Sequence, residues 1–125
     1  MREIYQRCHT DCFPTCVAMV ANISHRQAIQ LIHPFHVKGQ DYLTFEGDAV
    51  RALRFLGFKV RKRYLKDFTQ LKNSAIVIVN GADYRGDGHT VVWDPESQRI
   101  IDPARNQNVS LSFYQERTTH LYIVT

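Results

Sequence analysis

The stretch Cys8-His9-Thr10-Asp11-Cys12-Phe13-Pro14-Thr15-Cys16, with the apolar residues 17–23 that follow it, decides the fold. It holds all three cysteines of the chain, each four residues from the next. Such a cluster fits a metal site, a disulfide framework or one reactive thiol with two bystanders. Each of these predicts a different chemistry, and the rest of the sequence distinguishes among them.

Length and composition indicate one ordinary soluble domain. With 125 residues, 44% of them hydrophobic and 22% charged, the chain is long enough to bury a core without metal or disulfide staples. We therefore predict a single domain over residues 1–125. The N-terminal residues lack the apolar segment of a secretory signal, and no apolar run approaches the ~20 residues of a membrane span. We expect a cytoplasmic protein with no membrane partner, and the reducing compartment argues against disulfides, as does the odd cysteine count.

The positive charge of the chain is concentrated in one segment. The net charge is +4, and the basic residues gather in the sequence KVRKRYLK at 59–66, which also alternates like a strand. One interpretation is a patch that binds nucleic acid or an acidic partner. The favoured interpretation is a solvated edge strand kept soluble by Lys and Arg, because nothing else in the chain resembles a nucleic-acid recognition module.

The sequence pattern predicts helices first and strands later. Helical spacing and capping residues predict helices at 11–21, 24–32 and 44–57, with Asp11, Ser24 and Thr44 as N-caps and Gly57 as the final stop. After Gly57 the period changes to two, and the expected strands are 58–64, 75–79, 89–93, 99–101 and 120–124. The wholly apolar 75–79 is expected at the sheet centre, covered on both faces. This order predicts an α+β domain with an antiparallel sheet.

The three cysteines occupy different positions relative to the first helix. Cys12 is predicted in its first turn, where unpaired N–H groups and the positive end of the helix dipole stabilise a thiolate. Cys16 lies one turn deeper, in line with Met19, and is predicted to be a small buried core residue. Cys8 precedes the helix and carries no signal of its own. Cys12 is therefore the candidate nucleophile.

A metal site is the less favoured interpretation of the cluster. Structural zinc usually takes cysteine pairs two to four residues apart, with a second pair farther along the chain, and this sequence has no second pair. His9 offers one more ligand, but a helix that begins near Asp11 directs Cys12 and Cys16 along its own face. We predict neither a metal nor an organic cofactor.

A thiol nucleophile needs a base and a group that orients the base. Of the six histidines, His89 stands out because it opens a predicted hairpin. Asp94-Pro95-Glu96-Ser97 has the residues of a type I turn, and this turn places Trp93 opposite Gln98 and His89 opposite Asp102. Directly opposed residues share a face of the sheet, with Cβ atoms about 4.5–5.5 Å apart. Asp102 is therefore the predicted partner that orients His89.

Several of these residues resemble the pattern of a known family. Gln6-x4-Asp11-Cys12-x3-Cys16, His89-Thr-Val-Val and Asp102-Pro103 are similar in order and type to motifs of the bacteriocin-processing (double-glycine leader) cysteine peptidases and their freestanding papain-like relatives. In that family the Gln helps to form the oxyanion hole, the Cys attacks, and the His and Asp complete a triad. The resemblance implies these roles for Gln6, Cys12, His89 and Asp102.

The same resemblance implies a fold and a reaction. The fold would be that of a papain-like peptidase, with N-terminal helices packed on an antiparallel β-sheet. The reaction would be hydrolysis of a peptide or isopeptide bond in a peptide or protein substrate, with deamidation or amide transfer open to the same machinery. The family usually has Gly after the nucleophile, so we expect the bulkier Phe13 to reshape the substrate groove. Because no transporter segment is present, leader processing during export is not implied.

Two other functions compete with the hydrolase. One is an inactive domain of the same fold that grips a peptide or partner protein, since fold alone does not establish activity. The other is a nucleic-acid binder that uses the basic residues 59–66. The intact set of Gln6, Cys12, His89 and Asp102 favours the enzyme.

Overall fold

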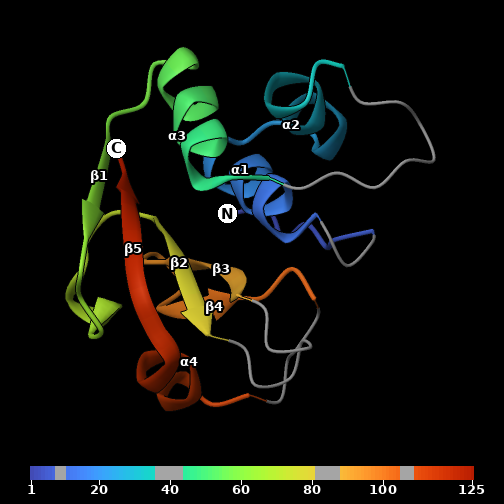
Figure 1. Cartoon of the computed structure of the whole chain (residues 1–125). Coiled ribbons are helices and arrows are strands. Elements are labelled where there is room, and N and C mark those ends of the chain that lie inside the picture. The colour runs from blue at the N-terminus through green and yellow to red at the C-terminus, as the bar shows by residue number, and fades with distance from the viewer. Residues whose placement is uncertain (8–10, 36–43, 81–87, 105–108) are drawn as a thin grey trace.

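A computed structural model describes residues 1–7, 11–35, 44–80, 88–104 and 109–125 (Figure 1). Its helices and strands follow in this order: α1 (Cys12–Ala21), α2 (His25–Ile32), α3 (Glu46–Phe55), β1 (Val60–Arg63), the 3-10 helix η1 (Phe68–Gln70), β2 (Ala75–Asn80), β3 (Gly88–Asp94), β4 (Arg99–Ile101), α4 (Leu111–Arg117) and β5 (Thr118–Val124). The three predicted helices and five predicted strands are all present. Within the described part of the chain, no helix is both long and apolar enough to cross a membrane.

The strands form one antiparallel sheet in the order β1-β5-β2-β3-β4. The central strand is β2, which pairs with β3 on one side and with β5 on the other. Its residues 75–77 are fully buried, which confirms the prediction that this apolar segment is covered on both faces. The basic strand β1 lies at one edge of the sheet, and its residues 61–63 are exposed.

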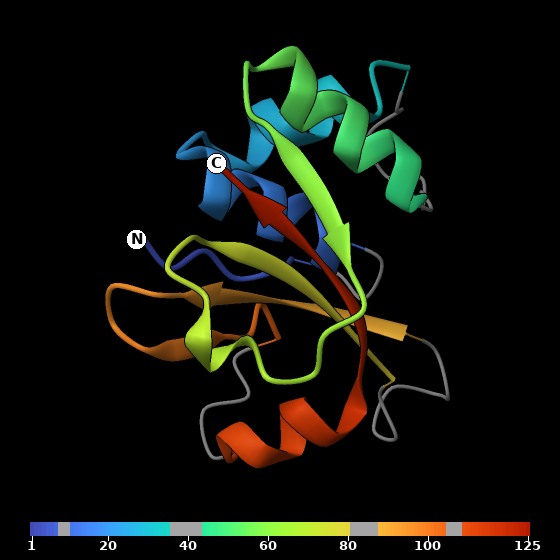
Figure 2. The ribbon, with the colours of Figure 1, turned by 90° about the vertical axis from the view of Figure 1, so that its left-hand side faces the viewer.

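Helices cover both faces of the sheet, as Figure 2 shows with α1, α2 and α3 on one side and α4 on the other. Alternate strand residues enter two separate cores. Ile76 and Val92 pack with the N-terminal helices, whereas Val77, Val91 and Trp93 pack with η1 and α4. This alternation is the period-two pattern of strands that are buried on both sides.

The starts of α2 and α3 differ in how they are capped. Ser24 caps α2 as predicted, within a capping box that also uses Gln27. The predicted cap of α3 is wrong: Phe45 holds the N-cap position without a side-chain bond. Thr44 instead bonds through its hydroxyl to Nε2 of His33 at 2.7 Å, because the end of α2 lies within reach of that hydroxyl.

The sequence pattern predicts neither η1 nor α4. Helix α4 has seven residues, which is too short to display a clear helical period. Its one local signal is Ser110, whose hydroxyl accepts a hydrogen bond from the N–H of Phe113. The helix matters for the site because it carries Tyr114 beneath the sheet, where this side chain is 3% exposed.

Candidate active site

The first turn of α1 presents Cys12 beside β3. Asp11 holds the N-cap position, but its side chain makes no cap hydrogen bond, so that part of the prediction is wrong. The carboxylate instead contacts residues outside the helix. Cys16 is fully buried one turn deeper, as predicted, with its Sγ 3.4 Å from the carbonyl oxygen of Thr90. Burial raises the pKa of the Cys16 thiol well above its usual value, so this thiol stays protonated.

Cys12 and His89 form a hydrogen-bonded pair. His89 is the second residue of β3 and is 5% exposed. Burial raises the pKa of the Cys12 thiol, but the hydrogen bond and charge of His89, with further hydrogen bonds to Thr90, outweigh this and lower it. Burial likewise lowers the pKa of His89, but the hydrogen bonds and charges of Asp102 and Cys12 raise it to about 9. Both shifts favour a thiolate–imidazolium pair.

Asp102 holds the other side of the imidazole. Its Oδ1 lies 2.7 Å from Nε2 of His89, which leaves Nδ1 of the ring for Cys12. The carboxylate also accepts hydrogen bonds from the hydroxyl of Tyr114 and the N–H of Ala104, both at 2.8 Å. Burial raises the pKa of Asp102, but these partners, led by His89, lower it, so the group stays ionised. No sequence pattern predicts the role of Tyr114, which reaches Asp102 because α4 packs under the sheet.

The hairpin that brings His89 to Asp102 differs from the predicted one. Asp94 pairs with Arg99 across a loop at 95–98, whereas the prediction places the loop at 94–97. Gln98 takes a left-handed conformation with φ of 56°, so strand pairing resumes one residue later. The predicted register is therefore wrong by two residues.

The two residues nevertheless meet, because a shift of two preserves the face of every side chain. The observed register directs Asp102, just past the end of β4, toward the position opposite Val91. His89 and Val91 are two residues apart on one strand and share a face. Asp102 is thus a diagonal neighbour of His89, with Cα atoms roughly 7–8 Å apart, a distance across which the imidazole can reach the carboxylate.

Gln6 lies beside this group on the N-terminal segment. Its backbone N–H donates to the carbonyl oxygen of Pro103 at 2.8 Å, directly after Asp102 in the chain. Its side-chain oxygen is buried. The structure therefore brings the segment that carries Gln6 to the end of β4, while the oxyanion role of this side chain stays a prediction.

The expectation for Phe13 is not met. Its side chain is 6% exposed and belongs to the core between α1, the other N-terminal helices and the sheet. A residue that points into the core cannot narrow a substrate groove at the surface. The Phe13 ring packs in the core on the face of the sheet that α1, α2 and α3 cover.

Two other histidines form pairs that do not include Cys12. His25 bonds to Asp11, and His120 bonds to Glu46. The metal interpretation involves Cys8 and His9, which lie outside the described residues. Among residues that are described, no three His, Cys, Asp or Glu side chains gather as a metal site would require.

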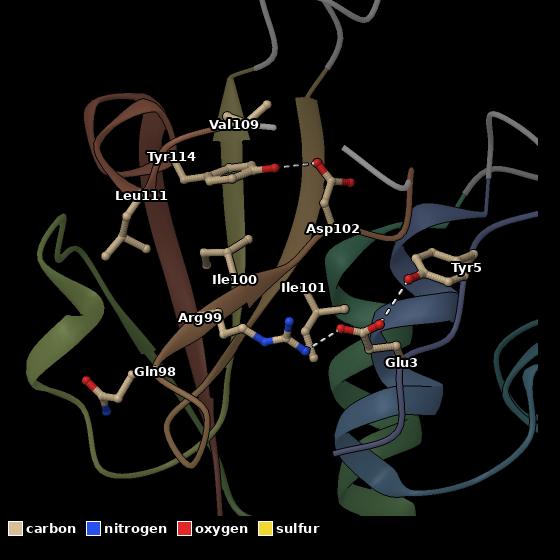
Figure 3. A pocket seen from close by; sticks show the side chains of 10 residues that line it. All are labelled: Glu3, Tyr5, Gln98, Arg99, Ile100, Ile101, Asp102, Val109, Leu111 and Tyr114. Carbon is tan, nitrogen blue, oxygen red and sulfur yellow. Dashed lines mark hydrogen bonds and ion pairs between the residues drawn. The ribbon is translucent and has the colours of Figure 1, made fainter. Parts of the chain in front are cut away.

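A cavity of about 430 Å³ adjoins the site on the side of Asp102 (Figure 3). In Figure 3 the hydroxyl of Tyr114 points to Asp102, and Arg99 reaches Glu3 of the N-terminal segment. The cavity is lined by Glu3, Tyr5, Gln98, Arg99, Ile100, Ile101, Asp102, Val109, Leu111 and Tyr114. It therefore lies between the N-terminal segment, β4 and α4.

Comparison with known proteins places this geometry in a known fold. No family model matches the chain, and no curated protein matches it. Among solved structures, a double-glycine motif protease from an AMS/PCAT transporter, in complex with its leader peptide, matches with a TM-score of 0.71 and 16% identity over 98% of this chain and 89% of that one. The peptidase domain of Streptococcus ComA, a bifunctional ABC transporter involved in a quorum-sensing pathway, matches with a TM-score of 0.65 and 19% identity over 98% and 96%.

The peptidase domain of Streptococcus mutans ComA with a small-molecule inhibitor is also similar, with a TM-score of 0.63 and 19% identity over 100% of this chain and 99% of that one. The chain has the papain-like fold of these peptidase domains. At such identities the likeness establishes the fold, and it confirms the α+β architecture predicted from the sequence.

Proposed function

We propose that the protein is a cysteine hydrolase that cleaves a peptide or isopeptide bond through Cys12, His89 and Asp102. The observation that carries the proposal is the continuous series of hydrogen bonds from the Cys12 thiol through His89 to Asp102. A partly buried thiol beside an imidazole of raised pKa is the arrangement that makes a nucleophile at neutral pH. The similar solved structures are peptidase domains, which supports the same class of reaction.

Each residue has a defined role in the proposed reaction. The Cys12 thiolate attacks the carbonyl carbon, and the backbone N–H of Cys12 and the side chain of Gln6 stabilise the oxyanion. His89 then gives its proton to the leaving amine, and a thioester forms on Cys12. His89 next takes a proton from water, which hydrolyses the thioester and restores the thiolate. Asp102 keeps the imidazole in the required tautomer and orientation throughout.

A peptide is the proposed substrate. One similar structure is a double-glycine motif protease in complex with a leader peptide. We extend that substrate class to this chain, so peptides with Gly-Gly before the cleaved bond are the first probes. An isopeptide-linked conjugate of a ubiquitin-like protein tests the isopeptidase alternative. A glutamine-containing peptide tests the deamidase alternative.

The deciding experiment compares Cys12→Ala with Cys16→Ala on a pool of Gly-Gly peptides, with cleavage followed by mass spectrometry. We expect Cys12→Ala to lose at least about 10³-fold in kcat/KM, as removal of a catalytic nucleophile does. Cys16→Ala is the matched control, because this thiol is fully buried and hydrogen-bonded away from the reacting group. Equal losses in the two variants would contradict the proposal. Peptide binding by the wild type without cleavage would instead support the inactive binding domain.

A further inference from the structure

A second buried acid–histidine pair lies next to the nucleophile. Asp11, the residue before Cys12, is 0% exposed. Its Oδ2 lies 2.9 Å from the backbone nitrogen of Arg7 and 2.6 Å from Nε2 of His25. His25 opens α2 and is 8% exposed. The backbone N–H of Arg7 donates to the carboxylate, and the Nε2–H tautomer of His25, which we assign from this contact, donates to it as well.

Both of these side-chain hydrogen bonds join Asp11 to residues outside the helix that it precedes. One runs back to Arg7 of the N-terminal segment and the other runs across to His25 of α2. The backbone oxygen of Asp11 accepts the first hydrogen bond of α1, from the N–H of Thr15 at 3.0 Å, while its carboxylate caps none of the N–H groups of the first turn. A cap residue would bond to the first turn of its helix. The contacts of Asp11 therefore join three segments of the chain.

The bond to Arg7 fixes the residue that follows Gln6. The N-terminal segment is consequently held at two adjacent points: Arg7 by Asp11, beside Cys12, and Gln6 by Pro103, beside Asp102. Gln6 is thus bonded to the residue that follows Asp102, and its neighbour Arg7 is bonded to the residue that precedes Cys12. Its position relative to Cys12 depends on both attachments.

We propose that Asp11 and His25 are positioning residues that hold Gln6 in register with Cys12 for oxyanion stabilisation. The proposal rests on the proposed peptidase function and deepens it. Neither residue contacts the reacting atoms. They act through the backbone, with His25 as the donor that fixes the Asp11 carboxylate and Asp11 as the acceptor that fixes Arg7. An oxyanion donor must sit within about 2.7–3.1 Å of the developing charge, so a small displacement of this segment lowers the rate.

The test uses a matched pair of substitutions at His25. His25→Gln can place an amide nitrogen near the position of Nε2, whereas His25→Leu has similar bulk and no donor. We expect His25→Leu to lower kcat by about 10-fold or more with little change in KM, since misplacement by 1 Å costs on the order of 10²-fold. His25→Gln should keep kcat within about 3-fold of the wild type. Assays run below the measured unfolding temperature of each variant.

Two further measurements separate positioning from general stability. The rate at which iodoacetamide alkylates Cys12 depends on its pairing with His89, and it should be the same in all variants. Amide hydrogen exchange of Arg7, measured by NMR, should be at least about 10-fold faster in His25→Leu and unchanged in His25→Gln. Asp11→Asn, which removes the charge without changing the bulk, should also speed exchange and lower kcat, and it replaces His25→Leu if that variant does not fold.

The outcomes distinguish this inference from the proposed function. An active wild type whose kcat survives His25→Leu, or an Arg7 amide that exchanges equally in all variants, overturns the positioning role and leaves the peptidase intact. A parallel loss of kcat and of Cys12 alkylation also overturns it, because the damage would then include the Cys12–His89 pair. A wild type that cleaves no probe refutes the proposed function, and the positioning role falls with it.

Discussion

The charge of His89 depends on its two neighbours. Burial lowers the pKa of the imidazole, but Asp102 and Cys12 together raise it to about 9. In the proposed reaction His89 gives a proton to the leaving amine, so we expect kcat/KM to fall as the pH rises through about 9. Asp102→Asn removes the carboxylate charge, so the pKa of His89 should drop and the alkaline limb should move to lower pH, with at least about 10-fold lower activity.

Tyr114→Phe is the control for that profile. It removes one hydrogen bond from Asp102 but keeps the carboxylate beside His89. The alkaline limb should therefore remain close to its wild-type position. An unchanged profile in Asp102→Asn would contradict the assigned partner of His89.

The reactivity of the cysteines gives a second prediction at the scale of single residues. The hydrogen bond and charge of His89 outweigh burial and lower the pKa of Cys12, whereas burial raises that of Cys16. At about pH 6, iodoacetamide should alkylate Cys12 first and leave Cys16 unmodified, because only a thiolate reacts rapidly. Peptide mapping after brief labelling measures this. Labelling of Cys8 at the same rate as Cys12 would count against the assignment.

The pairing of His89 with Asp102 is predictable from the sequence, but the side chains that hydrogen-bond to Asp102 and Asp11 are not. The pair lies within one hairpin, so a local turn brought it together even with a misplaced loop. Tyr114 and His25 reach Asp102 and Asp11 from separate helices. Contacts of that kind depend on how elements pack, and no spacing along the chain encodes them. The carboxylate of Asp11 departs from its predicted cap role for the same reason, since its partner His25 lies on α2.

At the scale of elements, long periodic segments were predictable and short ones were not. The helix boundaries at Ser24 and Gly57 follow from the residue types themselves, since Ser caps a helix N-terminus and Gly takes the left-handed conformation that ends one. Helix α4 has seven residues and η1 has three, so their formation depends on the sheet face that they cover. Tertiary burial, rather than propensity, is what stabilises such short helices.

Gly57 offers a test of element-scale stability. It follows α3 with a φ of 95°, and its N–H and that of Phe58 donate to Arg54 and Leu53. This is a Schellman end, which favours glycine. A methyl group added at Gly57 would meet nothing within 4 Å, so Gly57→Ala isolates the backbone strain. We expect a loss of about 1–2 kcal/mol in the free energy of unfolding, measured with urea.

Gly47→Ala is the matched control. Gly47 lies inside α3, and a methyl group there would likewise meet nothing within 4 Å. Because its backbone is helical, alanine should leave stability unchanged or raise it by up to about 1 kcal/mol. Equal effects at the two glycines would show that the conformation of Gly57 does not terminate α3.

At the scale of the whole molecule, the order of helices and strands was enough to predict the α+β class. It was not enough to predict that a late helix covers the second face. Helix α4 runs directly into β5, and no turn residue between them marks its end. The two sheet edges also differ. The segment with Glu3 and Gln6 contacts the β4 side through Arg99 and Pro103. The opposite edge, β1, carries exposed basic side chains instead.

The basic side chains of β1 are expected to keep this edge of the sheet from pairing with another molecule. Unpaired strand edges promote association between sheets, and charged residues prevent it. We expect the triple substitution of Arg61, Lys62 and Arg63 by Gln, which lowers the net charge from +4 to +1, to cause self-association in sedimentation velocity while kcat/KM stays unchanged. A control with the same charge change replaces by Gln three exposed residues outside the basic segment 59–66: Arg26, Arg51 and Lys72. Association in both triples would implicate net charge alone. Loss of binding to an oligonucleotide at physiological salt in the edge triple alone would instead identify β1 as a nucleic-acid surface.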